Sequence, residues 1–249
     1  MSKILIHGFP HCGTSILKSI IGHCESVDEI YNETITIRDT QHKFVLGKYP
    51  FTLDCFYDDP LYKSYIKIFI IRNPLFVFSS LNKRFKNEID HQHSIDEYIS
   101  TLRLFIKLRN MKNDTNTFFI RYEDLFENNH NNLKIILDTI GISYSNDIFD
   151  NTRYTNVHIQ YVPLLPTAPL NEDHSKYRTW QINQSFVSYN DVSKIQLTKA
   201  QLEKITENED ILCIYPEVKS LARVLIHENN FMCHPCKLLT IHENTTNNK

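Results

Sequence analysis

The sequence Gly8-Phe9-Pro10-His11-Cys12-Gly13-Thr14-Ser15 lies between an apolar run, Ile4-Leu5-Ile6, and an amphipathic segment that starts at Ile16. This order predicts a strand, a tight turn with a glycine at each end, and the start of a helix. The backbone N–H groups of such a turn and the N-terminus of the following helix point at one anion. The stretch therefore predicts a phosphate-binding loop after the first strand of an α/β fold.

The spacing of the two glycines is that of a P-loop, but one residue type is missing. Thr14-Ser15 follows Gly13 where nucleoside-triphosphatases have Lys-Ser or Lys-Thr. That lysine contacts the β- and γ-phosphates and supports phosphoryl transfer. Its absence keeps the phosphate site and argues against a triphosphatase. An ordinary strand–turn–helix corner is the alternative interpretation of this stretch taken alone.

A second motif follows the apolar run Tyr65–Ile71, which is typical of a buried parallel strand. The run leads directly into Arg72-Asn73-Pro74, where Pro74 suits the first turn of a helix. Arg72 is thereby placed at the carboxyl end of a strand, where open α/β sheets bind ligands. Ser80 and Arg84 share one face of the helix. The motif predicts a second phosphate site, with a surface arginine and a small packing serine as the alternative.

Together these motifs resemble those of the sulfotransferases that use 3′-phosphoadenosine 5′-phosphosulfate (PAPS). The family's first loop, P-K/R-S-G-T-T, holds the 5′-phosphosulfate and is similar to residues 10–15. Its R-x7-S motif holds the 3′-phosphate and matches Arg72 and Ser80. Arg84 resembles a further arginine that some members use on that phosphate. The resemblance covers about residues 3–140, and it implies that these residues bind PAPS: Pro10, His11, Cys12, Gly13, Thr14, Ser15, Arg72, Ser80 and Arg84.

Three further segments extend the resemblance. Phe119–Leu125 is similar to the family's R-Y-E-D-L segment, whose tyrosine lies by the adenine, which implies that role for Tyr122. Lys48-Tyr49-Pro50-Phe51-Thr52-Leu53 is similar to the K-D-P-F-T-L segment of protein-tyrosine sulfotransferases, whose lysine positions the sulfuryl group. Family members often bring a late basic segment across the 3′-phosphate or the acceptor. Arg178 is the candidate for that role, and a lid segment packed by Trp180 is the alternative.

The resemblance also implies how the reaction is catalysed. Negative charge grows on the leaving phosphate during sulfuryl transfer, so preorganised hydrogen-bond donors there assist it. The amides of residues 11–15, Lys48 and a protonated His11 are expected to supply them, although His11 replaces the usual lysine or arginine. A base must take the proton of the acceptor hydroxyl. The protein-tyrosine enzymes suggest Glu33 first and Glu29 second, with a solvated acidic loop as the alternative.

The alternation of expected strands and helices along the chain predicts an α/β, P-loop-like three-layer fold, with a central parallel sheet flanked by helices. One domain is expected over residues 1–242, with a disordered polar tail at 243–249. The expected strands are Lys3–His7, Lys43–Gly47, Tyr65–Ile71 and Thr117–Arg121. The expected helices are Thr14–His23, Leu75–Lys86, Ser94–Met111, Asn129–Ile140 and Lys199–Asn208.

Composition restricts the partners and the compartment. The formal net charge is -2, so no global basic field favours nucleic acid or an anionic membrane. No apolar run of about 18 residues could span a bilayer, and the first strand leaves no room for a signal peptide. Six cysteines in such a chain favour a reducing, cytoplasmic location. No metal is expected, because Cys233 and Cys236 form a single ligand pair where structural zinc needs two.

Three functions compete at this stage. The first is sulfuryl transfer from PAPS to an acceptor hydroxyl, which releases adenosine 3′,5′-bisphosphate (PAP). The family's K-T-H segment is absent, so the acceptor is left open among a tyrosine peptide, a sugar and a small molecule. The second is a nucleotide kinase, which would want the missing loop lysine. The third is a non-catalytic PAPS-binding module, in which His11 marks a lost charge. The oligomeric state is left open.

Overall fold

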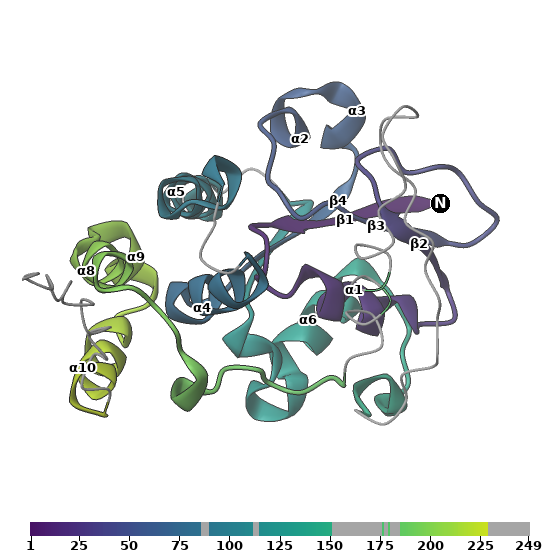
Figure 1. Cartoon of the computed structure of the whole chain (residues 1–249). Helices are drawn as coiled ribbons and strands as arrows, with labels where there is room; N and C mark the ends of the chain where they lie inside the picture. The colour runs from purple at the N-terminus through teal and green to yellow at the C-terminus, as the bar shows by residue number, and fades with distance from the viewer. Residues whose placement is uncertain (86–89, 112–114, 151–175, 177–178, 180–184, 229–249) are drawn as a thin grey trace, which may run out of the picture.

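A five-stranded, all-parallel sheet lies at the centre of the computed structural model, which describes residues 1–85, 90–111, 115–150, 176, 179 and 185–228 (Figure 1). The strand order is β2-β3-β1-β4-β5. The strands are β1 (Ser2–Gly8), β2 (Val27–Glu33), β3 (Phe44–Lys48), β4 (Ile66–Ile71) and β5 (Thr117–Arg121). This sheet confirms the predicted parallel α/β architecture.

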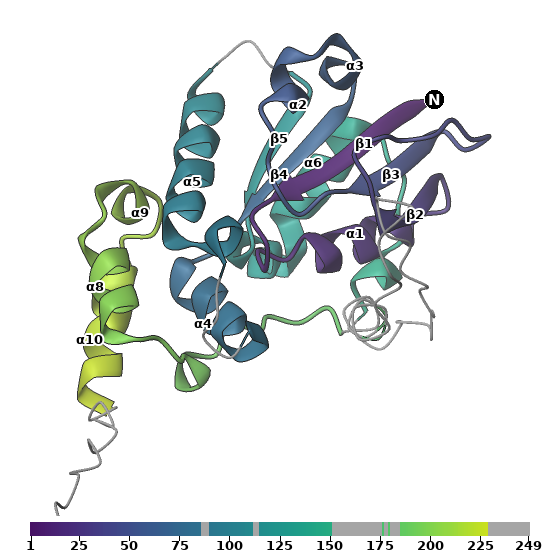
Figure 2. The same ribbon diagram turned by 45° about the horizontal axis from the view of Figure 1, so that its top comes forward.

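Helices cover both faces of the sheet, as Figures 1 and 2 show. Side chains that alternate along β1 separate the two cores: Ile4 and Ile6 pack toward α1 and α6, whereas Leu5 packs toward α2 and α3. Helix α5 lies on the same side as α2 and α3, over β4 and β5. The bounds are α1 (Thr14–Gly22), α2 (Cys55–Asp58), α3 (Pro60–Lys63), α4 (Pro74–Phe85), α5 (Ile95–Asn110) and α6 (Asn131–Ile140).

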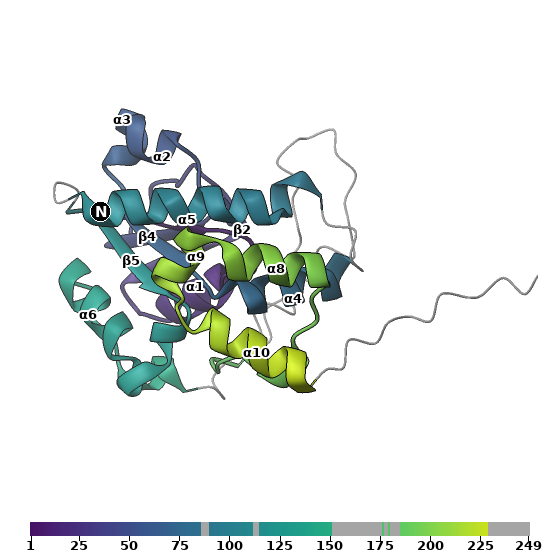
Figure 3. The ribbon, with the colours of Figure 1, turned by 90° about the vertical axis from the view of Figure 1, so that its left-hand side faces the viewer.

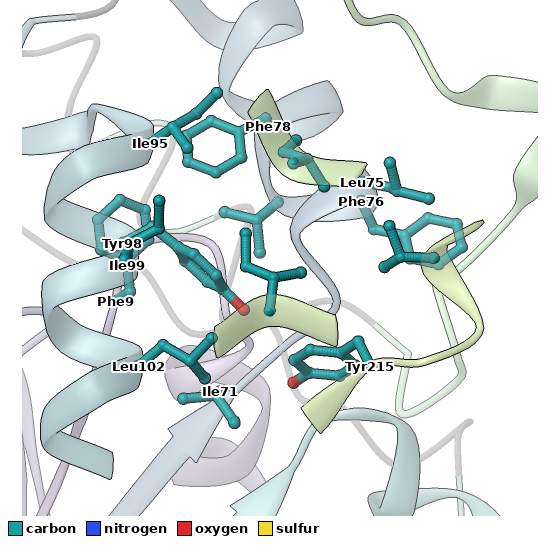
Figure 4. Packing of buried hydrophobic residues seen from close by; sticks show 14 of the residues in the cluster. Phe9, Ile71, Leu75, Phe76, Phe78, Ile95, Tyr98, Ile99, Leu102 and Tyr215 are labelled. Atoms are coloured by element: carbon teal, nitrogen blue, oxygen red, sulfur yellow. The ribbon is translucent and has the colours of Figure 1, made fainter. Parts of the chain in front are cut away.

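A third helical group packs against α4 and α5, away from the sheet (Figure 3). It consists of α8 (Lys199–Glu207), α9 (Glu209–Ile214) and α10 (Val218–Glu228). Tyr215, at the end of α9, is fully buried in the same core as Phe9 and Tyr98 (Figure 4). Phe9 lies within the predicted phosphate loop, so this core supports the loop from behind. Among the described residues, no helix has the length and apolar character that crossing a membrane requires.

Short 3-10 helices complete the described structure: η1 (His91–His93), η2 (Glu123–Leu125), η3 (Glu127–His130), η4 (Asn146–Phe149) and η5 (Val192–Lys194). The four predicted strands and the five predicted helices are all present, with ends that differ by two residues at most. Strand β2 is not among the predicted strands, because residues 27–33 carry several acidic side chains and no continuous apolar run. It is an edge strand that pairs with β3 alone, so it does not need the apolar run of a central strand.

The parallel arrangement brings the carboxyl ends of β1, β3 and β4 to one edge of the sheet. These ends are Gly8, Lys48 and Ile71, each followed by a segment that the sequence assigned to the donor site. The two central strands approach closely, because a Cβ atom on Gly8 would lie 2.1 Å from the carbonyl oxygen of Ile70. Only glycine is tolerated there. The predicted site residues are therefore placed side by side by the topology of the sheet.

Candidate functional site

A cavity of about 820 Å³ opens at this edge of the sheet. It has two ends, which we call the loop end (Gly13–Ser15, Lys48 and Glu33) and the arginine end (Arg72, Ser80 and Arg84). Lys83 and Lys194 add positive charge to its wall, against the carboxylates of Glu33 and Asp191. The predicted residues that line the cavity are Pro10, His11, Gly13, Thr14, Ser15, Glu33, Lys48, Arg72, Ser80, Arg84 and Tyr122. Its excess of basic side chains suits an anionic ligand.

The phosphate loop has the strained turn that its glycine spacing predicts. Gly13 has a left-handed φ of 93° and serves as the N-cap of α1. A Cβ atom at this position would lie 2.4 Å from the ring of Tyr122, so no other residue fits without displacement. His11 also has a positive φ, of 65°. The first N–H groups of a helix have no acceptor within it, so the start of α1, whose Gly13, Thr14 and Ser15 line the cavity, suits an anion.

Cys12 supports the loop from its inner side. Its side chain is fully buried, and its backbone N–H donates to the carbonyl oxygen of Phe9 at 3.1 Å. Burial raises the pKa of the Cys12 thiol to about 12, so no reactive thiolate forms at neutral pH. Cys12 is not among the residues that line the cavity. In this structure the Cys12 amide is used within the loop and the thiol faces the core, so a contact between Cys12 and the sulfuryl donor stays a prediction.

Lys48 and Glu33 meet at the loop end. The two residues are register partners at the ends of β3 and β2, and the Lys48 ammonium lies 3.1 Å from the Glu33 carboxylate. The same ammonium donates a hydrogen bond of 2.7 Å to the hydroxyl of Ser15. A buried lysine is thus tied both to the first turn of α1 and to a carboxylate that lines the cavity.

Glu29 lies away from the cavity. Its carboxylate pairs with the buried ammonium of Lys18 at 3.1 Å, and its side chain packs against Gly22 of α1. The pairing of β2 with β3 shifts register between Glu29 and Glu33. This irregularity lets the Glu33 carboxylate, but not that of Glu29, face the cavity. Of the two predicted bases, the structure brings only Glu33 to the site.

Arg72 is buried at the arginine end and is held by three hydrogen bonds to the protein. Its Nε donates to Oδ1 of Asn190 at 2.9 Å, and its terminal nitrogens donate to the carbonyl oxygens of His11 and Tyr189, both at 3.2 Å. The guanidinium carbon lies 4.3 Å from the centre of the Tyr122 ring. The guanidinium therefore links the loop, the R-Y-E-D-L segment and residues 189–190.

Tyr122 is a fully buried ring at the floor of the cavity. The Arg72 guanidinium lies over the Tyr122 ring, and Gly13 lies directly against the ring edge. The Tyr122 hydroxyl accepts a hydrogen bond from the Tyr189 N–H at 3.1 Å. A ring with such neighbours is a rigid support. Tyr189 lines the same cavity and is 41% exposed, so it offers a ring surface that Tyr122 does not.

His11 connects the two ends. Its Nδ1 lies 2.6 Å from the Ser80 hydroxyl, and burial lowers the pKa of the imidazole to about 3, with a further contribution from the positive charges of Arg84 and Arg72. The imidazole is therefore neutral at pH 7 in this structure. A protonated His11 was expected beside the bound donor, and that expectation stays a prediction: the charged form requires a compensating anion next to the imidazole.

His93 is a cavity residue that the sequence interpretation missed. Its side chain is 17% exposed, whereas that of the neighbouring His91 is 82% exposed. Its Nδ1 lies 2.6 Å from a carboxylate oxygen of Asp90, and its ring packs between those of Phe51 and Phe85. The Asp-x-x-His spacing, with Asp90 capping the turn of η1, is the signal that could have found it.

Several predicted features lie outside the described residues. These are Arg178, Trp180, Cys233, Cys236 and the tail at 243–249. In the part of the chain that the structure describes, no group of three or more histidine, cysteine or acidic side chains is arranged to hold a metal ion.

Comparison with known proteins identifies the fold. No family model and no curated protein sequence matches the chain. The structure is similar to that of mouse sulfotransferase SULT7A1 complexed with PAP, with a TM-score of 0.52, 17% identity and 89% of each chain covered. Weaker similarity extends to the sulfotransferase domain from the curacin biosynthetic pathway (TM-score 0.44, 11% identity, 88% of this chain and 97% of that one). It also extends to retinol dehydratase in a complex with retinol and PAP (TM-score 0.43, 11% identity, 92% of this chain and 82% of that one). The chain has the sulfotransferase fold that its motifs predicted.

Proposed function

We propose that this protein transfers a sulfuryl group from PAPS to an acceptor hydroxyl and releases PAP. The observation that carries the proposal is one cavity lined by two groups of residues that suit anions, Lys48 with the start of α1 and Arg72 with Ser80 and Arg84. A fold alone does not assign a function, so the proposal depends on the residues of this site. The solved complex of SULT7A1 with PAP, which shares the fold, supports the choice of nucleotide.

The loop end suits the leaving group. The N–H groups at the start of α1, the hydroxyl of Ser15 and the ammonium of Lys48 converge there, and the hydrogen bond from Lys48 to Ser15 fixes their spacing at 2.7 Å. In the proposed step the bond from sulfur to the 5′-phosphate oxygen breaks, and its electron pair goes to that oxygen. Fixed positive groups that need no rearrangement stabilise this charge most effectively.

Glu33 is the proposed base. As the acceptor oxygen forms its bond to sulfur, the hydroxyl proton passes to the Glu33 carboxylate, so the proton and both bonds are accounted for. The ion pair with Lys48, at 3.1 Å, holds the carboxylate beside the loop. The lysine thereby positions the base and the leaving group together.

The arginine end is the proposed site of the 3′-phosphate. Arg84 and Ser80 line it from one face of α4, and Arg72 lies at its floor. Guanidinium groups bind phosphate through charge-assisted hydrogen bonds, which are roughly twice as strong as neutral ones. Tyr122 is proposed as support below the nucleotide, and Arg178 remains a candidate on the strength of the family resemblance.

The acceptor is proposed to be a hydroxyl compound: a tyrosine peptide, a sugar or a small molecule. A cytoplasmic location is proposed as well. All four cysteines in the described residues, Cys12, Cys24, Cys55 and Cys213, are free thiols, which suits a reducing compartment.

Two experiments test the function in order. Calorimetric titration with PAP, ATP and AMP should show that PAP binds at least about tenfold more tightly than ATP. Transfer of radiolabelled sulfate from PAPS is then measured over panels of tyrosine peptides, sugars, phenols and aliphatic alcohols. Tighter binding of ATP than of PAP would favour the kinase. Binding of PAP without transfer to any acceptor would leave a binding module.

A further inference from the structure

A buried carboxyl group, that of Glu123, interacts electrostatically with Arg72 and so competes with an anionic ligand for its charge. Glu123, of the same R-Y-E-D-L segment as Tyr122, is buried beside it, and its Oε2 has no hydrogen-bond partner among the described residues. Burial raises the pKa of the Glu123 carboxyl, and the Arg72 charge acts in the opposite direction. One amide side chain links the guanidinium to the carboxylate, and the two opposite charges attract each other across it.

The side-chain amide of Asn190 stands between these two groups. Its Oδ1 accepts the hydrogen bond from Arg72 Nε at 2.9 Å, and its Nδ2 donates to Oε1 of Glu123, also at 2.9 Å. A side-chain amide offers an acceptor to the cation and a donor to the anion from two separate atoms. The amide orientation is thereby determined by its partners, since the reverse would set its NH2 group against the guanidinium.

The other contacts hold Glu123 and Asn190 in place. Oε1 of Glu123 also accepts from the backbone N–H of Asn73, the residue after Arg72, at 3.0 Å. The backbone next to Asn190 is fixed as well, because the Tyr189 carbonyl accepts from Arg72 and the Tyr189 N–H donates to Tyr122. The Asn190 amide is thus held in place between Arg72 and Glu123.

We propose that Asn190 is a positioning residue that keeps Arg72 from pairing with Glu123. The inference rests on the proposed function, because the charge that Asn190 preserves is the one offered to the 3′-phosphate. A direct pair would neutralise Arg72 and use the N–H groups that a phosphate needs. The neutral amide satisfies both partners while it leaves the net charge of the guanidinium toward the cavity.

The test compares four proteins by calorimetric titration with PAP and AMP: wild type, Asn190→Ala, Glu123→Gln, and the double variant. Glu123→Gln keeps an acceptor oxygen for Asn73 and Asn190 but removes the competing charge. Asn82→Ala is the matched control, since Asn82 is a buried asparagine of α4 that bonds Gln196 and Gln201 outside the cavity lining. Thermal unfolding of each variant reports the cost to the fold.

Asn190→Ala should weaken PAP by about tenfold or more, the value of a charge-assisted contact, and AMP by much less. The double variant should recover most of that loss, because no carboxylate remains to capture Arg72. A purely structural asparagine would not be rescued by removing a charge, so failure of the rescue overturns the proposal. Equal binding by Asn190→Ala and wild type overturns it too.

A second variant keeps the proposal testable if Asn190→Ala does not fold. Asn190→Asp preserves the shape but pairs an acid directly with Arg72, so it should also weaken PAP relative to AMP; unchanged PAP affinity would contradict the proposal. If wild type itself does not bind PAP, the proposed function fails together with this inference. If wild type binds and the variants do not differ, only the inference fails.

Discussion

The loop end of the cavity owes its geometry to strand register, whereas the arginine end owes its geometry to segments far apart in the chain. Lys48 and Glu33 are partners on neighbouring strands, 15 positions apart. Arg72 is held by Asn190, 118 positions later, and by Tyr189, 117 positions later. The first kind of geometry is set as soon as the sheet forms, and the second depends on how the chain returns from α6.

The two ends also differ in their expected roles. At the loop end the proposed base and a lysine contact one another, so changes there should affect the rate of transfer. At the arginine end the residues are proposed to hold a phosphate that does not react, so changes there should affect affinity. His11 joins them, because its ring bonds Ser80 while its carbonyl oxygen accepts from Arg72.

The largest effect is expected at Lys48. Lys48→Met should lower the turnover of sulfuryl transfer by about 100- to 1,000-fold, the value of one preorganised group at a developing anion. Lys43→Met is the control, since Lys43 is exposed at the start of the same strand and bonds the Gly141 carbonyl. Steady-state rates should fall for the first variant alone. Similar rates for the two variants would remove Lys48 from the reaction.

The next effect is expected at Glu33. Glu33→Gln should reduce turnover by roughly 100-fold while PAP affinity survives, because the base is lost and the phosphate contacts remain. Glu29→Gln should instead keep near-normal turnover and lower the melting temperature, as it weakens a buried pair with Lys18. The opposite pattern in these two variants would reassign the base to Glu29.

At the arginine end, Arg72→Ala should weaken PAP by about 30- to 100-fold and AMP far less, which corresponds to about 2–3 kcal/mol. Its matched control is Arg121→Ala at the end of the next strand, where the guanidinium pairs with Asp124 at 2.7 Å and does not line the cavity. Calorimetry with both nucleotides distinguishes the cases. An equal loss of affinity for PAP and AMP in Arg72→Ala would mean that Arg72 stabilises the loop and does not bind the 3′-phosphate.

Gly13 tests whether the two ends share one support. Gly13→Ala should destabilise the protein by about 2–4 kcal/mol, because a left-handed φ and a clash with Tyr122 act together. Gly141→Ala has a similar φ of 80°, but its Cβ would meet only Nζ of Lys43 in ordinary contact at 3.9 Å, so it should cost only about 1 kcal/mol. Chemical denaturation measures both. Equal costs would show that Tyr122 yields easily and does not couple the ends.

The smallest effect concerns pH and His11. Its pKa is about 3 in the fold against 6.5 in the unfolded chain, so below pH 6.5 the unfolded state binds more protons and stability falls. His11→Asn should lessen the loss of stability between pH 7 and pH 5 by at most about 2 kcal/mol. Urea denaturation at the two pH values checks this. His7, whose pKa is also lowered to about 3 by burial, remains in both proteins as a constant background.

His11 also bears on catalysis. A bound anion beside the imidazole should raise its pKa, so His11→Lys should maintain sulfuryl transfer to higher pH than wild type. Identical pH profiles for the two proteins would leave His11 as a loop residue without a charge role.

Sequence patterns predicted the elements whose signals are local. The loop of residues 8–15 has both glycines within one turn, and the run before Arg72 is apolar enough to be a buried strand. The end of α6 is marked by Gly141, whose left-handed conformation closes the helix. The same patterns missed β2, because an edge strand that carries acidic residues has no distinctive periodicity.

The sequence by itself determined which side chains carry the candidate chemistry and which strands deliver them, since parallel strands must bring their carboxyl ends to one edge. It left open which acid faces the cavity, what charge His11 bears, and what holds Arg72. Those were decided by a register shift in β2, by burial among positive charges, and by the return of residues 187–190. Each depends on distances between residues that are remote in the chain, and such distances exist only once the chain has packed.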